Sequence, residues 1–140
     1  CRAGTTTPYA FGTTLSQWLA NVASSGTTEV GSFPANAWGL HDMHGNVWEW
    51  CLDHWHHGYE GAPADGSAWL STAEQQNPST TKPVKGVIDD SEPRLLRGGS
   101  WSHRPGYCRS AFRGRFRPVS AFYFVGFRVV CLPQGPSLSP

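Results

Sequence analysis

Regular hydrophobic periodicity in this sequence is confined to short segments, which limits the folds that the chain can adopt. One short helix is expected over residues 14–23, with Leu15, Trp18, Leu19 and Val22 on one face. The expected strands are aromatic or β-branched and bounded by Gly, Pro or Asn: Asn46–Cys51, Leu95–Trp101, Cys108–Phe112 and Tyr123–Cys131. The pattern therefore predicts short strands, little helix and many loops.

The composition indicates one domain whose stability comes from aromatic packing and loop geometry. The chain has 140 residues, of which 39% are hydrophobic and only 15% charged, with seven Trp and sixteen Gly. No apolar run is long enough to cross a membrane, and no signal peptide is evident. We expect a domain over residues 1–131, a Gly/Pro/Ser-rich excursion over 58–93 that packs on itself, and a disordered tail over 132–140.

Charge is distributed unevenly along the chain. All ten acidic residues lie at or before Glu92, whereas the segment from Arg94 to Arg128 carries eight arginines. One interpretation is a nucleic-acid surface, with the Arg-Gly-Arg-Phe-Arg run at 113–117 mixing charge and stacking. The other is pairing of these arginines with acids inside the fold, and the absence of Lys there favours it. A nucleic-acid partner is therefore not expected.

Four cysteines, Cys1, Cys51, Cys108 and Cys131, are too few and too far apart for a disulfide framework. Buried free thiols are the default, and a Cys51–Cys131 bridge stays open. The redox compartment and the localisation are therefore undetermined from cysteine usage.

Several separated blocks resemble the C-terminal part of the formylglycine-generating enzyme (sulfatase-modifying factor) family. They are "VGSFPANAWGLHDMHGNVWEWCLDHW", "LLRGGSW", "CRSAFR" and "GFRVV", in the family's order. The resemblance implies an α+β, C-type-lectin-like fold with much irregular structure, in which the first half of the family domain is missing here.

The resemblance also bears on enzymatic activity. Enzymes of this family oxidise a substrate cysteine with dioxygen and Cu(I), which two cysteine thiolates bind. The corresponding positions here are His103 and Cys108, so no copper is expected. A formylglycine-generating-type copper oxidase, or a degenerate sulfatase-modifying enzyme, is the alternative function.

A different branch with this fold fits the C-terminal third better: the variable proteins of diversity-generating retroelements. In these proteins, adenines of Asn codons are randomised, which cannot yield Lys, Glu, Gln, Met or Trp, and none of these five occurs from Ser102 to Phe124. The resemblance implies a display protein that binds an unknown protein or glycan, with prokaryotic, phage or cell-surface display as its setting. The implied variable positions are Ser102, His103, Arg104, Gly106, Tyr107, Phe112, Gly114, Phe116, Ser120, Phe122, Tyr123 and Phe124.

An ordinary core strand over residues 122–125 is the competing explanation of this segment. Three consecutive aromatics speak against it, because side chains of a strand alternate between its faces. Exposed Tyr, Phe, Ser, Gly and Arg are also typical of binding loops. If the segment is variable, its intervening neighbours should be buried, since a packed core tolerates volume changes poorly; these are Trp101, Cys108, Ala111, Val125 and Phe127.

The segment "DMHGNVWEW" predicts a calcium site by the same resemblance. Its oxygen ligands would be the carboxylates of Asp42 and Glu49 and the carbonyls of Gly45 and Val47. A turn that enters a strand, with Glu49 paired to a scaffold arginine, is the alternative. A second family calcium site would begin at Asn21, but its downstream partners are missing.

Two further groups of residues carry weak signals. The His54-x-His56-His57 run has metal-ligand spacing but only Asp53 nearby, so a solvated loop is favoured. Ser100 lacks the Gly-x-Ser-x-Gly elbow of a hydrolase nucleophile.

Overall fold

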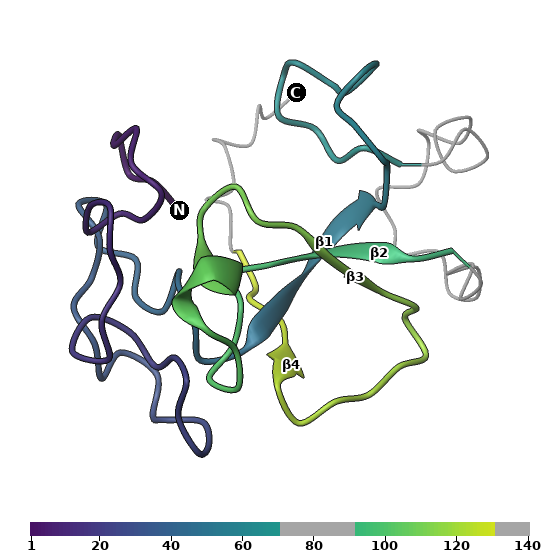
Figure 1. Ribbon diagram of the computed structural model, residues 1–140. Coiled ribbons are helices and arrows are strands. Elements are labelled where there is room, and N and C mark those ends of the chain that lie inside the picture. Colours follow the sequence, from purple (N-terminus) through teal and green to yellow (C-terminus); the bar gives the residue numbers. More distant parts are fainter. Residues whose placement is uncertain (71–91, 131–140) are drawn as a thin grey trace, which may run out of the picture.

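The computed structural model describes residues 1–70 and 92–130, and a small curled sheet forms its centre (Figure 1). The strands are β1 (Trp48–His54), β2 (Arg94–Arg97), β3 (Gly114–Phe116) and β4 (Val125–Gly126). One 3-10 helix, η1 (Pro105–Cys108), precedes β3. The irregular first 47 residues lie beside the sheet, next to η1 (Figure 1).

The sheet has the strand order β3-β2-β1-β4. β1 pairs with β2 antiparallel, with Trp50 opposite Leu96, and β2 pairs with β3 antiparallel, with Leu96 opposite Gly114. β4 joins the other edge of β1 in parallel, with Glu49 opposite Gly126. The two blocks Arg97–Trp101 and Gly126–Val130 are thereby brought to the same end of β1.

The prediction of a helix over residues 14–23 is wrong, because this segment forms turns. Leu19 N–H donates to the Ser16 carbonyl, Trp18 is 89% exposed, and Ala23 has a φ of 47°. The buried Asn21 side chain donates hydrogen bonds to the Asn46 side chain and to the Gly26 carbonyl. These bonds stabilise a looped backbone in place of a helix. Within the described residues no α-helix is present, and no helix is long and apolar enough to cross a membrane.

The expected strands are correct at the sheet centre and wrong toward the C-terminus. β1 and β2 overlap the first two expected strands, although β1 extends to His54 and β2 begins at Arg94 and ends at Arg97. The expected strand Cys108–Phe112 is instead the end of η1 and a turn, in which Phe112 N–H donates to the Arg109 carbonyl. Of the strand expected from Tyr123, only Val125–Gly126 forms, since the residues after it have no partner strand in the described part of the chain.

One buried cluster of the core lies between the irregular N-terminal region and η1, and its members are Tyr9, Leu15, Ala20, Val22 and Cys108. Ala3, Trp48 and Leu96 are also buried hydrophobic residues. Gly99 is needed for this packing, because its φ is 76° and a Cβ there would collide with the Cys108 side chain. The Arg97–Trp101 block therefore lies close against η1 at Gly99.

Candidate binding surface over residues 102–124

The twelve positions implied to be variable lie on the loops around η1 and on β3 and the segment before β4. None of them is fully buried. The exposed ones are Ser102, Arg104, Gly106, Tyr107, Phe122 and Tyr123, and the half-buried ones are His103, Phe112, Gly114, Phe116, Ser120 and Phe124. Solvent therefore reaches all twelve positions, and their role in binding stays a prediction.

His103 lies among aromatic side chains near η1. Its ring makes edge contacts with Trp48, Tyr107 and Phe124, at centroid distances of 5.6, 5.4 and 5.7 Å. Burial lowers the pKa of His103, so the ring is neutral near pH 7. A neutral imidazole in this place packs as a ring and also offers polar nitrogens.

The remaining rings extend from Phe124. Phe122 stacks on it at 5.2 Å with the ring planes 10° apart, and Phe116 lies 4.6 Å from Phe122. Tyr123 contacts Phe124 on one side and Trp101 on the other. We call the connected set the aromatic cluster; it consists of Trp48, Trp101, His103, Tyr107, Phe112, Phe116, Phe122, Tyr123 and Phe124.

A hydrogen bond with the buried Ser100 hydroxyl orients the His103 ring. This hydroxyl is fully buried and lies 2.6 Å from His103 Nδ1, while the Ser102 hydroxyl lies 3.1 Å from the same nitrogen. Among the residues that the structure describes, no carboxylate bonds to His103, so the arrangement lacks the acid of a hydrolase triad. The contact orients a surface ring on a buried support.

The expectation of buried neighbours is only partly correct. Cys108 is fully buried, and Trp101 and Val125 are half-buried. Ala111 is exposed and Phe127 is 76% exposed, so the prediction is wrong for these two. Phe127 lies beyond the short strand β4, where no described element covers it.

Position 114 has less freedom than the other implied variable positions. A Cβ on Gly114 would lie 3.3 Å from Trp48 Cζ3 and 3.4 Å from Leu96 Cβ. Because both neighbours are buried, a larger residue there would require the sheet to adjust. We therefore expect glycine or small residues at this position.

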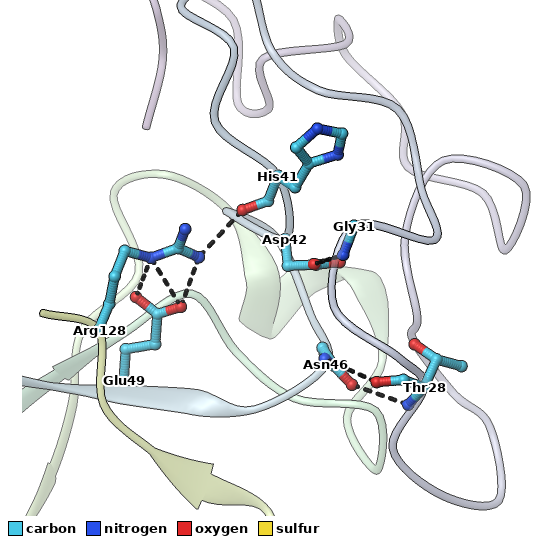
Figure 2. Close-up of polar contacts among 7 residues, drawn as sticks. All are labelled: Thr28, Gly31, His41, Asp42, Asn46, Glu49 and Arg128. Atoms are coloured by element: carbon cyan, nitrogen blue, oxygen red, sulfur yellow. Dashed lines mark hydrogen bonds and ion pairs between the residues drawn. The ribbon is translucent and has the colours of Figure 1, made fainter.

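The four residues of the expected calcium site line one cavity of about 530 Å³. In Figure 2 the Glu49 carboxylate faces Arg128, whose Nη2 also donates to the His41 carbonyl at 2.9 Å. The Asp42 carboxylate accepts from the backbone N–H of Gly31 at 2.7 Å. These residues include oxygen donors of the kind that calcium binds, but Glu49 would have to leave Arg128 to ligate an ion, and the calcium site stays a prediction.

Of the two alternatives from the sequence, the pairing of Glu49 with a scaffold arginine is present, and calcium binding stays a prediction. All four residues of the expected calcium site line the same cavity. No three His, Cys, Asp or Glu residues of the described ranges form a metal-binding group, and this includes the His54–His57 loop. There His56 stacks on Trp69, with ring centroids 3.6 Å apart.

The thiols of Cys51 and Cys108 are poorly suited to form thiolates. Burial raises the pKa of Cys108 to about 12 and that of Cys51 to about 11. Cys51 is a free thiol, while Cys131, its suggested disulfide partner, lies outside the described residues, as does the 132–140 tail.

Sequence reasoning missed His44, which joins the two parts of the fold. It is 2% exposed, its Nδ1 lies 2.8 Å from the Cys108 carbonyl, and its Nε2 accepts from Ala10 N–H at 3.0 Å. Because Nε2 accepts, the proton is on Nδ1 and the ring is neutral. Its place inside the "DMHGNVWEW" block was the only available signal.

The curled sheet, the irregular surroundings and the surface next to η1 define a C-type-lectin-like domain of the formylglycine-generating-enzyme type. The family model of the sulfatase-modifying factor enzyme 1-like domain matches residues 2–132. The chain belongs to this family.

Relatives with several names share this domain. The serine/threonine-protein kinase pkn1 of Chlamydia caviae is 37% identical over 128 residues, which are 91% of this chain and 18% of that protein. The formylglycine-generating enzyme of Mycobacterium tuberculosis is 36% identical over 115 residues, 77% of this chain and 34% of that protein.

Solved structures support the same assignment. PvdO from Pseudomonas aeruginosa has a TM-score of 0.71 and 37% identity, covering 90% of this chain and 46% of that one. Treponema denticola variable protein 1 has a TM-score of 0.59 and 27% identity, covering 90% and 41%. The chain spans less than half the length of each of these four relatives.

Proposed function

We propose that this domain is a ligand-binding display protein whose residues 102–124 form a diversified binding surface. The observation that carries the proposal is the aromatic cluster. Seven of its nine rings belong to implied variable positions, and they form one connected set on a face where no implied variable residue is fully buried. Rigid aromatic side chains supply contact area at low entropic cost.

The support beneath this surface agrees with the proposal. Ser100, Cys108 and Leu96 are fully buried, and they hold the loops that carry the variable positions. A scaffold can accept substitutions where side chains point away from such a core. The likeness to Treponema denticola variable protein 1 supports the same interpretation.

The test is a library. Codons for the six exposed positions are randomised, and the variants are displayed and selected against several unrelated proteins and glycans. We expect most variants to fold and specific binders to emerge for more than one target. A matched library over six exposed frame positions should yield far fewer binders, and equal yields would contradict the proposal. Those six are Thr14, Ser25, Thr27, Gly58, Glu60 and Ala64.

A second test of the proposal is genetic. The DNA next to this gene should contain a near-copy of the codons for Gly98 to Val130, with Asn codons at the twelve positions and a reverse transcriptase gene nearby. A locus without such a repeat would contradict diversification by this route.

The alternative function, oxidation of a substrate cysteine with copper, rests on relatives named formylglycine-generating enzyme. Here an imidazole stands at one of the two implied thiolate positions, and the thiol at the other is fully buried with a pKa of about 12. Both features oppose a pair of copper-binding thiolates, and binding is therefore the function that we favour.

A further inference from the structure

A second concave site lies beside the binding surface, in a pocket of about 400 Å³ between the N-terminal segment, the residue after β1 and the loop before β3. Three arginines line it, Arg2, Arg109 and Arg113, together with the rings of Trp55 and Phe112. None of these arginines is among the twelve implied variable positions. The pocket is therefore a feature of the scaffold, and Phe112 is its border with the variable surface.

The charge of this pocket is uncompensated. No carboxylate lines it, and within residues 1–70 and 92–130 none of the three arginines makes an ion pair. Their hydrogen bonds go to neutral carbonyls: Arg2 Nη1 to Thr6 at 2.9 Å, and Arg109 Nε to Gly106 at 2.9 Å. Within the described residues, neither terminal nitrogen of Arg109 has an acceptor. These nitrogens can donate two parallel hydrogen bonds to a carboxylate.

Arg113 is held in place by aromatic rings. Its guanidinium carbon lies 4.7 Å from the Trp55 ring centroid and 4.6 Å from that of Tyr59, and Nη2 donates to the His57 carbonyl at 3.1 Å. Arg115 covers the same indole at 5.1 Å. A guanidinium fixed in this way loses little entropy when it meets an anion, so the Arg113 part of the lining is preorganised.

We infer that this pocket binds an organic carboxylate with an aromatic or other apolar body. The guanidinium groups of Arg2 and Arg109 would take the carboxylate, and the rings of Trp55 and Phe112 would contact the body. A nucleic acid needs cations along a track that follows its phosphates, with bases stacked in succession. One pocket with three arginines in its lining fits a single anionic group better.

The test uses phenylacetate as the probe and phenylacetamide as its neutral match. Each is titrated into the chain and followed through the NMR signal of the Trp55 indole N–H. Phenylacetate should shift this signal in a saturable way. The affinity for phenylacetamide should be lower by about tenfold or more, because this compound lacks the charge. Equal affinity for the two compounds would overturn the inference.

Arginine variants locate the site. Arg109→Gln and Arg2→Gln should each weaken phenylacetate binding about tenfold. Arg117→Gln removes the same charge from an exposed residue outside the pocket and should leave the affinity unchanged. Loss of binding in all three variants would show a general charge effect and would overturn the inference, as would unchanged binding in both pocket variants with retained folding.

Two competitors distinguish other sources of the anion. Inorganic phosphate or a single-stranded oligonucleotide that displaces phenylacetate at equal or lower concentration would replace the carboxylate proposal with a phosphate site. Weak displacement by both would support it. Because the pocket arginines lie outside the variable positions, a failed display library would leave this result standing.

Discussion

The Glu49 carboxylate holds the Arg128 guanidinium through both of its oxygens, with Nε 3.0 Å from Oε2 and Nη2 2.7 Å from Oε1 (Figure 2). This pair ties β1 to the segment that follows β4, where few other contacts secure the chain. The carboxylate also lines the cavity that contains Asp42, Gly45 and Val47. Glu49 therefore forms an ion pair and also belongs to the expected calcium site.

We predict that calcium raises the thermal stability of the chain by competing with Arg128 for Glu49. An ion that binds only the folded state stabilises it by mass action, by about 2.7 kcal/mol at a hundredfold excess over the dissociation constant. Melting temperatures in calcium and in chelator measure this effect. Arg128→Gln should enlarge the difference, because it frees the carboxylate.

Asp42→Ala should abolish the calcium effect, whereas Glu60→Gln, at an exposed carboxylate outside the cavity, should keep it. Because Asp42 has a φ of 56°, alanine lowers the stability by itself, so the difference between calcium and chelator is compared within each variant. An identical response of wild type and Asp42→Ala would mean that calcium binds elsewhere or not at all.

Acid should destabilise the chain through His44. Burial lowers the pKa of this residue, so the folded state disfavours the proton that the unfolded state accepts at about pH 6.5. The stabilisation is present above that pH and is lost as the pH falls toward the lowered folded-state pKa. Urea unfolding between pH 7.5 and 5 should show a decreasing free energy of unfolding, by at most about 1.4 kcal/mol per pH unit for this group.

His44→Gln keeps a donor and an acceptor but does not titrate, and it should flatten this pH dependence. His103, whose pKa is lowered by desolvation, contributes in the same direction, and His103→Asn isolates its share. An unchanged slope in His44→Gln would assign the acid sensitivity to other groups.

We predict no oxidation of a sulfatase-type cysteine peptide by the chain with Cu(I) and dioxygen. The physical reasons are the imidazole of His103 and the buried Cys108 thiol, whose pKa of about 12 opposes ionisation. Restoring a thiol with His103→Cys alone should not produce turnover. Mass spectrometry of the peptide measures the outcome, and formylglycine formed by the wild-type chain would refute the prediction.

The sequence was a good guide where short-range geometry determines the structure. The central strands β1 and β2 follow from local residue types. Asp42 and Glu49, which the resemblance named together, line one cavity. The strands depend on a pattern of residue types within a few positions, and Asp42 and Glu49 lie in one short block of the sequence.

Features that depend on distant partners were missed. Residues 14–23 have helical spacing, but the side-chain bonds of Asn21 to Asn46, 25 positions away, stabilise a looped path. His44 and the Arg2–Arg109–Arg113 pocket unite segments that no local pattern connects. Phe127 looked like a core residue by its type, yet burial requires an element that packs on it.

The frame and the variable surface should respond differently to substitution. Phe122→Asn combined with Tyr123→Asn replaces two exposed rings and should lower the free energy of unfolding by about 1 kcal/mol or less per residue. Phe127→Asn, at a residue that is 76% exposed, should also leave the chain folded, contrary to what its sequence position suggests. Gly99→Ala should cost about 2–4 kcal/mol, because the new methyl group meets the Cys108 side chain and the backbone has a φ of 76°. Chemical denaturation of the three variants measures these costs. If the surface pair destabilises the chain as much as Gly99→Ala does, the aromatic cluster is a core rather than a binding surface.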